Sequence, residues 1–270
     1  MTQTPSFPLL EHPAFSGVSE ASVFRLEREC NVFRFDLGGQ LSDPNKIPAR
    51  ILVILQGQAR LVGRHNGRLT TVGKFGPGSV IGAASLLAGS PCENVIAADE
   101  LIACGISDEL WRELYATEAS FRHWCDQQLW PQELLKLLEA LEQNTPEVER
   151  SALEKLEDAL QTAERCSPDP AAVDAALADG KLLFVTSAWG DLTVGQPVGS
   201  FMDLPACEPF SLRLVSLPAS GFFDSAQETT DNSSGSLISA SSIQDAEAGR
   251  DTNRSENGSQ AGRSMDERTG

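Results

Sequence analysis

Long apolar runs are missing from this sequence. The two longest, residues 51–55 and 182–185, hold five and four residues, whereas a helix needs about 20 apolar residues to cross a bilayer. The first 15 residues lack the basic stretch followed by an apolar one that marks a secretory leader. We therefore expect a cytoplasmic protein without direct membrane insertion.

Positive charge is scarce as well. The 270 residues include 21 Lys and Arg against 38 Asp and Glu, which gives a formal net charge of −17. Nucleic acids and anionic lipids are bound by clustered basic side chains, and no run of consecutive basic residues occurs here. The composition predicts no nucleic acid partner, and it disfavours a helix-turn-helix with a basic recognition helix.

Cysteine and histidine are few and scattered. The six cysteines include no Cys-x-x-Cys pair, and the three histidines lie far apart in the sequence. A zinc ribbon or a cupin-type metal centre needs several such ligands close together. One cysteine, Cys92, precedes Glu93, whose charge disfavours a reactive thiolate. We expect reduced thiols, no metal or cofactor, and no enzymatic activity.

Short strand-like segments are present from residue 32 to residue 106. They recur about every eight to twelve residues with turn signals between them, a pattern typical of an antiparallel sandwich or barrel. Glycine supplies the turns, as in Asn66-Gly67 and Gly76-Pro77-Gly78. The predicted strands cover residues 32–37, 51–55, 59–64, 69–75, 80–81, 95–98 and 101–106.

Helical periodicity begins after Ile106. Leu110, Trp111, Leu114 and Tyr115 fall on one helical face, and Ser107 is the expected N-cap. Further helices are predicted over residues 119–129, 134–141 and 170–177. Another helix is expected to begin after Thr145 as N-cap, with Pro146 in its first turn and Leu153, Leu156 and Leu160 on one face.

The last third of the chain changes in composition twice. Strand-like sequence patterns return at residues 181–189 and 210–217. They predict a small α+β subdomain. Residues 220–270 hold nine acidic and four basic residues among few apolar ones, so we expect them to be disordered. The predicted organisation is a flexible N-terminus (1–20), a β-roll with C-terminal helices (21–130), a helical and small strand subdomain (131–219) and a disordered tail (220–270).

The segment from residue 51 to residue 100 resembles the core of a cyclic-nucleotide-binding domain. An apolar strand, a glycine-anchored hairpin, a G-P-G turn and a strand–helix cassette follow one another in the family's order. The family cassette reads F-G-E-[apolar]-A-L and then P-R-x-A-[TS]-V, where this chain has IGAASL and PCENVI at the same spacing. The resemblance implies an α+β fold with a jelly-roll or cupin-like β-roll followed by helices. Its implied ligand-binding positions are Gly82, Ala83, Ala84, Ser85, Pro91, Cys92 and Val95.

Two side chains of that cassette depart from the family. The position implied for the ribose-binding glutamate is Ala83, and the position implied for the phosphate-binding arginine is Cys92. A neutral thiol does not replace the charged fork of arginine, and Glu93 adds negative charge. Losing one such buried pair costs about 2–5 kcal/mol of binding, so we expect no tight binding of cAMP or cGMP. The backbone N–H groups of Ala84 and Ser85, at the start of a short helix, still suit an anion.

No other basic residue is well placed to replace the missing arginine. The alternation of residues 59–61 puts Arg60 toward solvent while Ala59 and Leu61 point inward. The same reasoning turns the other basic residues of the hairpin outward. Arg122, in a predicted helix, is the remaining candidate, although surface arginines are usually just solvated.

Several longer phrases resemble the cytoplasmic amino-terminal regulatory region of cyanobacterial ABC exporters that secrete peptides and toxins. They are VFRFDLGGQL (32–41), ILVILQGQARLVG (51–63), GPGSVIGAASLLAGSPCENVIA (76–97), WGDLTVGQPVGS (189–200) and FSLRLVSLP (210–218). No Walker loop is present, so we expect a free-standing regulatory piece or part of a split transporter.

Two functions are compatible with these patterns. The first is a non-enzymatic cytosolic regulatory or docking module, with exporter subunits or another protein as partner at the cytoplasmic face of the membrane. The alternative is a small-ligand sensor for cAMP, cGMP or another metabolite, which acts through conformational change of the helices over residues 110–141.

Overall fold

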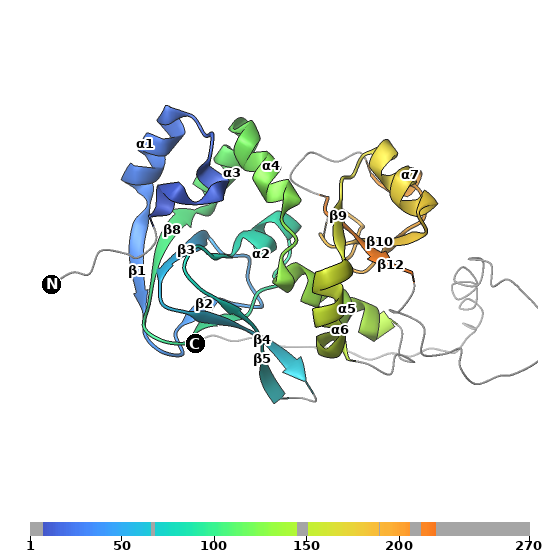
Figure 1. Ribbon diagram of the computed structural model, residues 1–270, viewed down its shortest axis with the longest axis horizontal. Helices are drawn as coiled ribbons and strands as arrows, with labels where there is room; N and C mark the ends of the chain where they lie inside the picture. The colour runs from blue at the N-terminus through green and yellow to red at the C-terminus, as the bar shows by residue number, and fades with distance from the viewer. Residues whose placement is uncertain (1–7, 66–67, 145–150, 189, 206–211, 220–270) are drawn as a thin grey trace, which may run out of the picture. The chain divides into compact units, whose positions relative to one another are not determined.

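The computed structural model describes residues 8–65, 68–144, 151–188, 190–205 and 212–219 (Figure 1). All of them belong to one compact unit, Met1–Gln227. Its elements are antiparallel sheets and helices, so the predicted α+β class with a β-roll followed by helices is confirmed. No helix in these ranges is long and apolar enough to span a bilayer.

The roll consists of two antiparallel sheets. One sheet has the order β1-β8-β3-β6 and the other the order β2-β7-β4-β5. Gly57 makes the turn after β3 with a φ of +85°, and a Cβ there would lie 2.5 Å from the carbonyl oxygen of Glu100. The strands are β1 Asn31–Phe35, β2 Gln40–Ser42, β3 Arg50–Gln56, β4 Ala59–His65, β5 Arg68–Phe75, β6 Val80–Ile81, β7 Val95–Ala97 and β8 Leu101–Ser107.

Strand β3 is buried on both faces, which is why its sequence is a continuous apolar run. Leu52 and Ile54 join one hydrophobic cluster, and Ile51 and Val53 join a second on the opposite face. The second cluster contains the helix that Ser107 caps, where the backbone N–H of Leu110 donates to Ser107 Oγ at 3.2 Å. The predicted N-cap and buried helical face after Ile106 are therefore confirmed.

The helices cover the roll and extend past it (Figure 1). They are α1 Glu20–Glu29, α2 Ala83–Ala88, α3 Asp108–Thr117, α4 Ala119–Gln127, α5 Pro131–Asn144, α6 Ala152–Thr162 and α7 Pro170–Ala178, with 3-10 turns η1 Leu9–Glu11, η2 Pro13–Phe15 and η3 Phe201–Asp203. Helix α6 begins later than predicted. Its N-cap is Ser151, which forms a capping box with Glu154, and the expected cap at Thr145-Pro146 lies outside the described residues.

The prediction of a flexible N-terminus over residues 1–20 is wrong for residues 8–20. His12, Ala14 and Phe15 are buried, and the Phe15 ring stacks on Phe121 of α4 with centroids 5.9 Å apart. A few large apolar side chains offset the ordering of this short segment. Residues 1–7, like the tail predicted at 220–270, lie outside the described part of the chain.

A third sheet follows the roll, with the order β11-β10-β12-β9. Its strands are β9 Glu164–Cys166, β10 Lys181–Val185, β11 Pro197–Val198 and β12 Leu214–Pro218. One hydrophobic cluster joins Leu52 of the roll, Leu134 and Leu138 of α5, and Val215 and Leu217 of β12. The core therefore continues across the predicted boundary at residue 130.

Candidate functional site

The cassette is built at the N-terminus of α2. Gly82 is the N-cap and has a φ of +100°, a region that glycine adopts readily and L residues rarely do. A Cβ at this position would lie 3.1 Å from the carbonyl oxygen of Arg50 and from Pro48 Cγ. Every residue of α2 is buried, so its first N–H groups need partners inside the protein.

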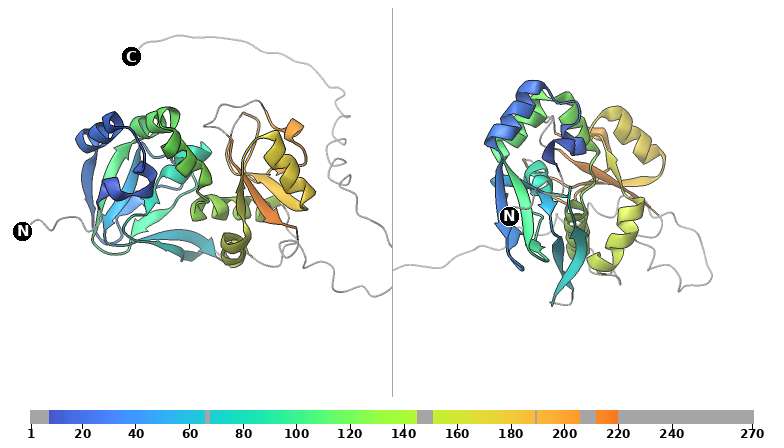
Figure 2. Two further views of the ribbon diagram at one scale, coloured as in Figure 1. Left: turned by 45° about the horizontal axis from the view of Figure 1, so that its top comes forward. Right: turned by 60° about the vertical axis from the view of Figure 1, so that its left-hand side comes forward.

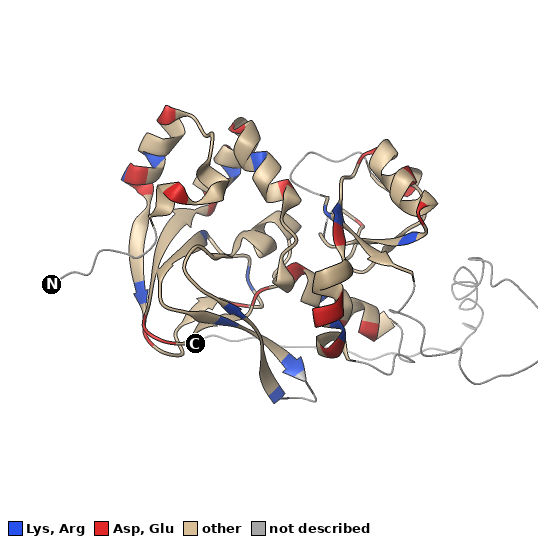
Figure 3. Ribbon diagram, viewed as in Figure 1, with Lys and Arg blue, Asp and Glu red and all other residues tan. Residues whose placement is uncertain are grey.

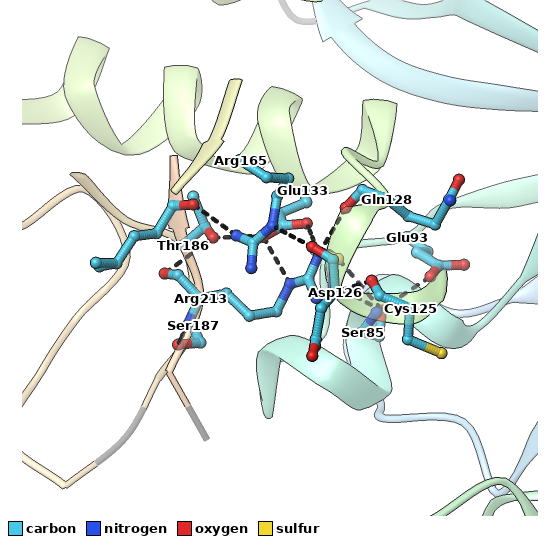
Figure 4. A network of polar contacts seen from close by, with 12 residues as sticks. Ser85, Glu93, Cys125, Asp126, Gln128, Glu133, Arg165, Thr186, Ser187 and Arg213 are labelled. Atoms are coloured by element: carbon cyan, nitrogen blue, oxygen red, sulfur yellow. Dashed lines mark hydrogen bonds and ion pairs between the residues drawn. The ribbon is translucent and has the colours of Figure 1, made fainter. Parts of the chain in front are cut away.

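Glu93 provides those partners. Its side chain is fully buried, and its carboxylate accepts hydrogen bonds from the Gly82 N–H at 2.6 Å and the Ser85 N–H at 3.1 Å. Backbone N–H groups at a helix N-terminus form an anion-binding site. The anion in this site is a carboxylate of the chain itself (Figure 4).

The environment of Glu93 also sets its protonation. Burial raises the pKa of Glu93 to about 7, while the hydrogen bonds from the backbone of Gly82, Ser85 and Ala84 act in the opposite direction. The group is therefore close to half ionised near neutral pH. Both forms accept at least one of the backbone hydrogen bonds.

Replacing Glu93 with glutamine is expected to remove a pH dependence of stability. The folded-state pKa of about 7 lies above the ordinary 4.5, so the folded state holds more protons between these values and stability falls as the pH rises. Between about pH 5.5 and about pH 8.5, the wild type should lose about 2 kcal/mol of unfolding free energy relative to Glu93→Gln.

Urea unfolding at a series of pH values measures this difference. The comparison with the variant cancels groups common to both proteins, such as His12, whose burial lowers its pKa and makes its contribution run in the opposite direction. A difference that stays constant with pH would contradict the assignment.

Cys92 also lies at this site, and its side chain is neutral. Its backbone N–H donates to Ser85 Oγ at 3.1 Å, and its Sγ lies 3.5 Å from the same oxygen. Burial raises the pKa of the Cys92 thiol, and the charge of Glu93 adds to the effect. A protonated thiol is a poor nucleophile, so the position offers neither an arginine-like charge nor a reactive thiolate.

The remaining cassette positions predicted from the sequence lie close by. Ala83 and Ala84 are buried in α2, and Val95 is buried in β7 opposite Leu61 of β4. Pro91 and Cys92 line a hollow of about 210 Å³ together with residues of β4 and α5. Small-molecule pockets usually hold about 300–1,000 Å³, so this hollow is small for a nucleotide.

A second buried polar group lies beside the cassette, at positions that no sequence pattern marks as a site. Glu133 of α5 accepts from Arg213 Nε at Oε1 and from Arg213 Nη2 at Oε2, both at 2.9 Å. Thr186 Oγ1 also donates to Glu133, and Arg165 Nη1 lies 3.6 Å from Glu133 Oε1 (Figure 4). This ion-pair cluster joins α5 to β9 and to the segments flanking β10 and β12.

The charges in the ion-pair cluster hold one another ionised. Burial alone would raise the pKa of Glu133, but the charges of Arg213 and Arg165 keep it below its usual value. Burial and the like charge of Arg213 lower the pKa of Arg165 to about 10. Arg213 lies closer to the carboxylate than Arg165 does, and the pKa of Arg213 is raised despite burial because of Glu133.

The segment that follows β10 also contacts the cassette helix directly. The backbone N–H of Ala188 donates to the carbonyl oxygen of Ala88 at 2.9 Å, at the last residue of α2. Ser187 Oγ accepts from the backbone N–H of Arg213 at 2.9 Å. Glu93 thus accepts hydrogen bonds from N–H groups at the N-terminus of α2, and the segment after β10 donates one to a carbonyl oxygen at its C-terminus.

The arginine considered as a replacement from the sequence serves elsewhere. Arg122 Nε donates to the carbonyl oxygen of Tyr115 at 3.0 Å, and Nη2 donates to that of Ala116 at 2.7 Å. It therefore ties α4 to the end of α3. In the described ranges, no group of three or more His, Cys, Asp or Glu side chains is arranged to hold a metal ion.

Comparison with known proteins yields structures rather than families. No family model matches the chain, and no curated protein matches it either. Among solved structures, similar ones are the regulatory subunit of a cAMP-independent protein kinase A from Trypanosoma cruzi bound to guanosine (17% identity, 43% of this chain and 45% of that chain, TM-score 0.36) and a cyclic nucleotide-binding domain from Methylobacillus flagellatus (22%, 40% and 62%, 0.35).

A cAMP-binding acyltransferase from Mycobacterium smegmatis is also similar (16% identity, 50% of this chain and 40% of that chain, TM-score 0.36). The matched region spans about half the length of the trypanosomal subunit. The strands of this chain form a β-roll of two antiparallel sheets, with helices after it.

Proposed function

We propose that this chain is a non-enzymatic, cytoplasmic regulatory or docking module in which Glu93 takes the place of a cyclic nucleotide. The observation that carries the proposal is the pair of hydrogen bonds from Gly82 and Ser85 to the buried Glu93 carboxylate. A cyclic phosphate has to displace this carboxylate or lie beside it. Displacement costs free energy because it leaves the buried Glu93 carboxylate unpaired. Binding beside the carboxylate costs free energy because it brings two anions together.

The protein is therefore expected not to bind cAMP or cGMP. Isothermal titration calorimetry with either nucleotide up to millimolar concentration should give only heats of dilution. A measured Kd in the micromolar range for either nucleotide would overturn the proposal, because the backbone site would then be open to an external phosphate.

The partner that we propose is a subunit of an ABC-type peptide exporter, which places the module at the cytoplasmic face of the membrane. The support is the set of sequence phrases over residues 32–97, 189–200 and 210–218 that resemble exporter regulatory regions. Biolayer interferometry of the full chain against purified exporter subunits from the same genome tests this. Absence of binding to every subunit would remove the exporter as partner.

A small-ligand sensor remains the second candidate. The observation in its favour is the hollow of about 210 Å³ lined by Arg64, Asn94, Lys136 and Glu139, which offers polar groups to a compact ligand. Guanosine is a suitable neutral probe, because the similar trypanosomal subunit was solved with it bound. A ligand at 100 times its Kd adds about 2.7 kcal/mol of stability, so thermal shift with guanosine, cAMP and cGMP separates a sensor from a docking module.

A further inference from the structure

The charges of this chain are unevenly distributed. Residues 44–92 contain no Asp or Glu and six Lys or Arg, although the whole chain has 38 acidic and 21 basic residues. Two of the six basic residues have local partners. Lys46 Nζ lies 3.8 Å from Asp43 Oδ2, and the Arg50 guanidinium lies 4.3 Å from the centre of the Phe33 ring.

The other four basic residues, Arg60, Arg64, Arg68 and Lys74, all belong to the β4–β5 hairpin. None of them forms an ion pair with another described residue. Figure 3 shows basic segments and no acidic segment along this hairpin, whose far end extends away from the body of the roll (Figure 1; Figure 2, right). The hairpin is a basic projection on an acidic protein.

The register of the hairpin brings like charges together. Arg60 of β4 is directly opposite Lys74 of β5, and Arg64 lies on the same face as Arg60 because side chains alternate along a strand. Like charges directly opposite each other destabilise a sheet. In addition, Arg60 Nε is buried and has no hydrogen-bond acceptor among the described residues. An external anion at this face would relieve the repulsion between Arg60 and Lys74.

Strand β5 also has an open edge. It is the last strand of its sheet, and residues 68–71 are exposed, with Leu69 exposed by 67%. An open edge offers unpaired backbone N–H and C=O groups to an extended peptide. Basic residues on an edge also protect against aggregation, but that role needs one or two charges of either sign and not an acid-free run of 49 residues.

We propose that β5 binds an acidic, extended segment of a partner protein as an added strand, with Arg60, Arg64 and Lys74, which share one face of the hairpin, pairing its carboxylates. The inference rests on the docking function proposed above and identifies the surface that performs it. A peptide fits this surface better than nucleic acid does, because the peptide backbone can form hydrogen bonds with the unpaired N–H and C=O groups of β5. The formal net charge of −17 also opposes a long polyanion.

The test uses the full chain and a labelled peptide as long as β5, eight residues, in which glutamate alternates with valine or threonine. The peptides of the set differ in whether valine or threonine stands at each neutral position. Fluorescence anisotropy at low salt measures their binding. The control peptides are the same sequences with lysine for glutamate, and the same sequences N-methylated at alternate residues to block strand pairing. We expect the acidic peptides to bind, and neither control to do so.

Paired variants locate the site on the protein. Arg64→Gln with Lys74→Gln should weaken binding at least about tenfold, which corresponds to the loss of one charge-assisted hydrogen bond. Arg28→Gln with Arg112→Gln removes the same charge from α1 and α3 and should leave the Kd unchanged. Circular dichroism and size-exclusion chromatography show that each variant is folded and monodisperse.

The outcomes that overturn the inference are distinct. They are no binding by any acidic peptide, equal binding by the hairpin variant, equal binding of N-methylated peptides, or tighter binding of single-stranded DNA. If the wild type and the hairpin variant bind an exporter subunit equally, the docking function stands and this surface is wrong. If cAMP binds to the wild type, the proposed function fails whatever the hairpin does.

Discussion

Replacing Arg213 with methionine should lower the free energy of unfolding by about 3–5 kcal/mol, the usual effect of removing one partner of a buried ion pair. The Glu133 carboxylate is fully buried and would lose two hydrogen bonds of 2.9 Å. Arg165, at 3.6 Å, is too far to replace them without moving. Equilibrium urea unfolding followed by tryptophan fluorescence gives the value.

A second variant separates loss of the pair from loss of the side chain's volume. The triple substitution Glu133→Leu, Arg165→Met and Arg213→Met removes all three charges of the cluster and should be more stable than Arg213→Met alone, since hydrophobic replacement of buried ion pairs is often neutral. Arg122→Met is a matched control, because Arg122 donates only to backbone carbonyls at the ends of α3 and lies partly in solvent. If Arg213→Met and Arg122→Met cost the same, the ion-pair cluster does not stabilise the fold.

Cyclic nucleotide binding should appear only when Glu93 is removed and the glutamate and arginine of the cyclic-nucleotide-binding motif that this segment resembles are introduced. The triple variant Ala83→Glu, Cys92→Arg, Glu93→Ala frees the N–H groups of Gly82 and Ser85 and supplies the charged groups that the family uses. We expect a Kd for cAMP in the micromolar range, a gain of at least about a hundredfold, or 2.7 kcal/mol. Calorimetry on the folded variant measures it.

The double variant Ala83→Glu, Cys92→Arg is the informative control. It keeps Glu93, which retains the hydrogen bonds from Gly82 and Ser85 and pairs with the new arginine, so we expect no cAMP binding. Binding by the double variant as tight as that of the triple variant would show that Glu93 does not block the site. A folded triple variant that does not bind cAMP would contradict the prediction.

The β-roll could be predicted because its signals are local. Turn glycines and strand periodicity mark β3, β4, β5 and β8, and Ser107 marks the start of α3. Helix α1 was missed because its sequence is polar on most positions and only Leu26 is fully buried. Strand β9, three residues long, has no pattern of its own and forms by pairing with β12.

The short strand and helix of the cassette were predictable, but the partners of the helix N-terminus were not. Spacing located the cassette, and Glu93 was recognised as an unfavourable charge, but its hydrogen bonds to Gly82 and Ser85 depend on a turn that no local pattern encodes. The pairing of Glu133 with Arg213 spans 80 residues. The available signals were an arginine next to the apolar strand β12 and a glutamate in the first turn of the leucine-rich helix α5.

The hydrogen bond from Ala188 to Ala88 has a thermodynamic consequence. It makes α2 a shared element, with a proton-binding carboxylate at one end and the segment that continues from β10 of the third sheet at the other. Binding equilibria that act on one shared element are reciprocally linked. A ligand that binds the third sheet more tightly when Glu93 is protonated must raise the affinity of Glu93 for its proton by the same factor, so its dissociation constant depends on pH around the pKa of about 7.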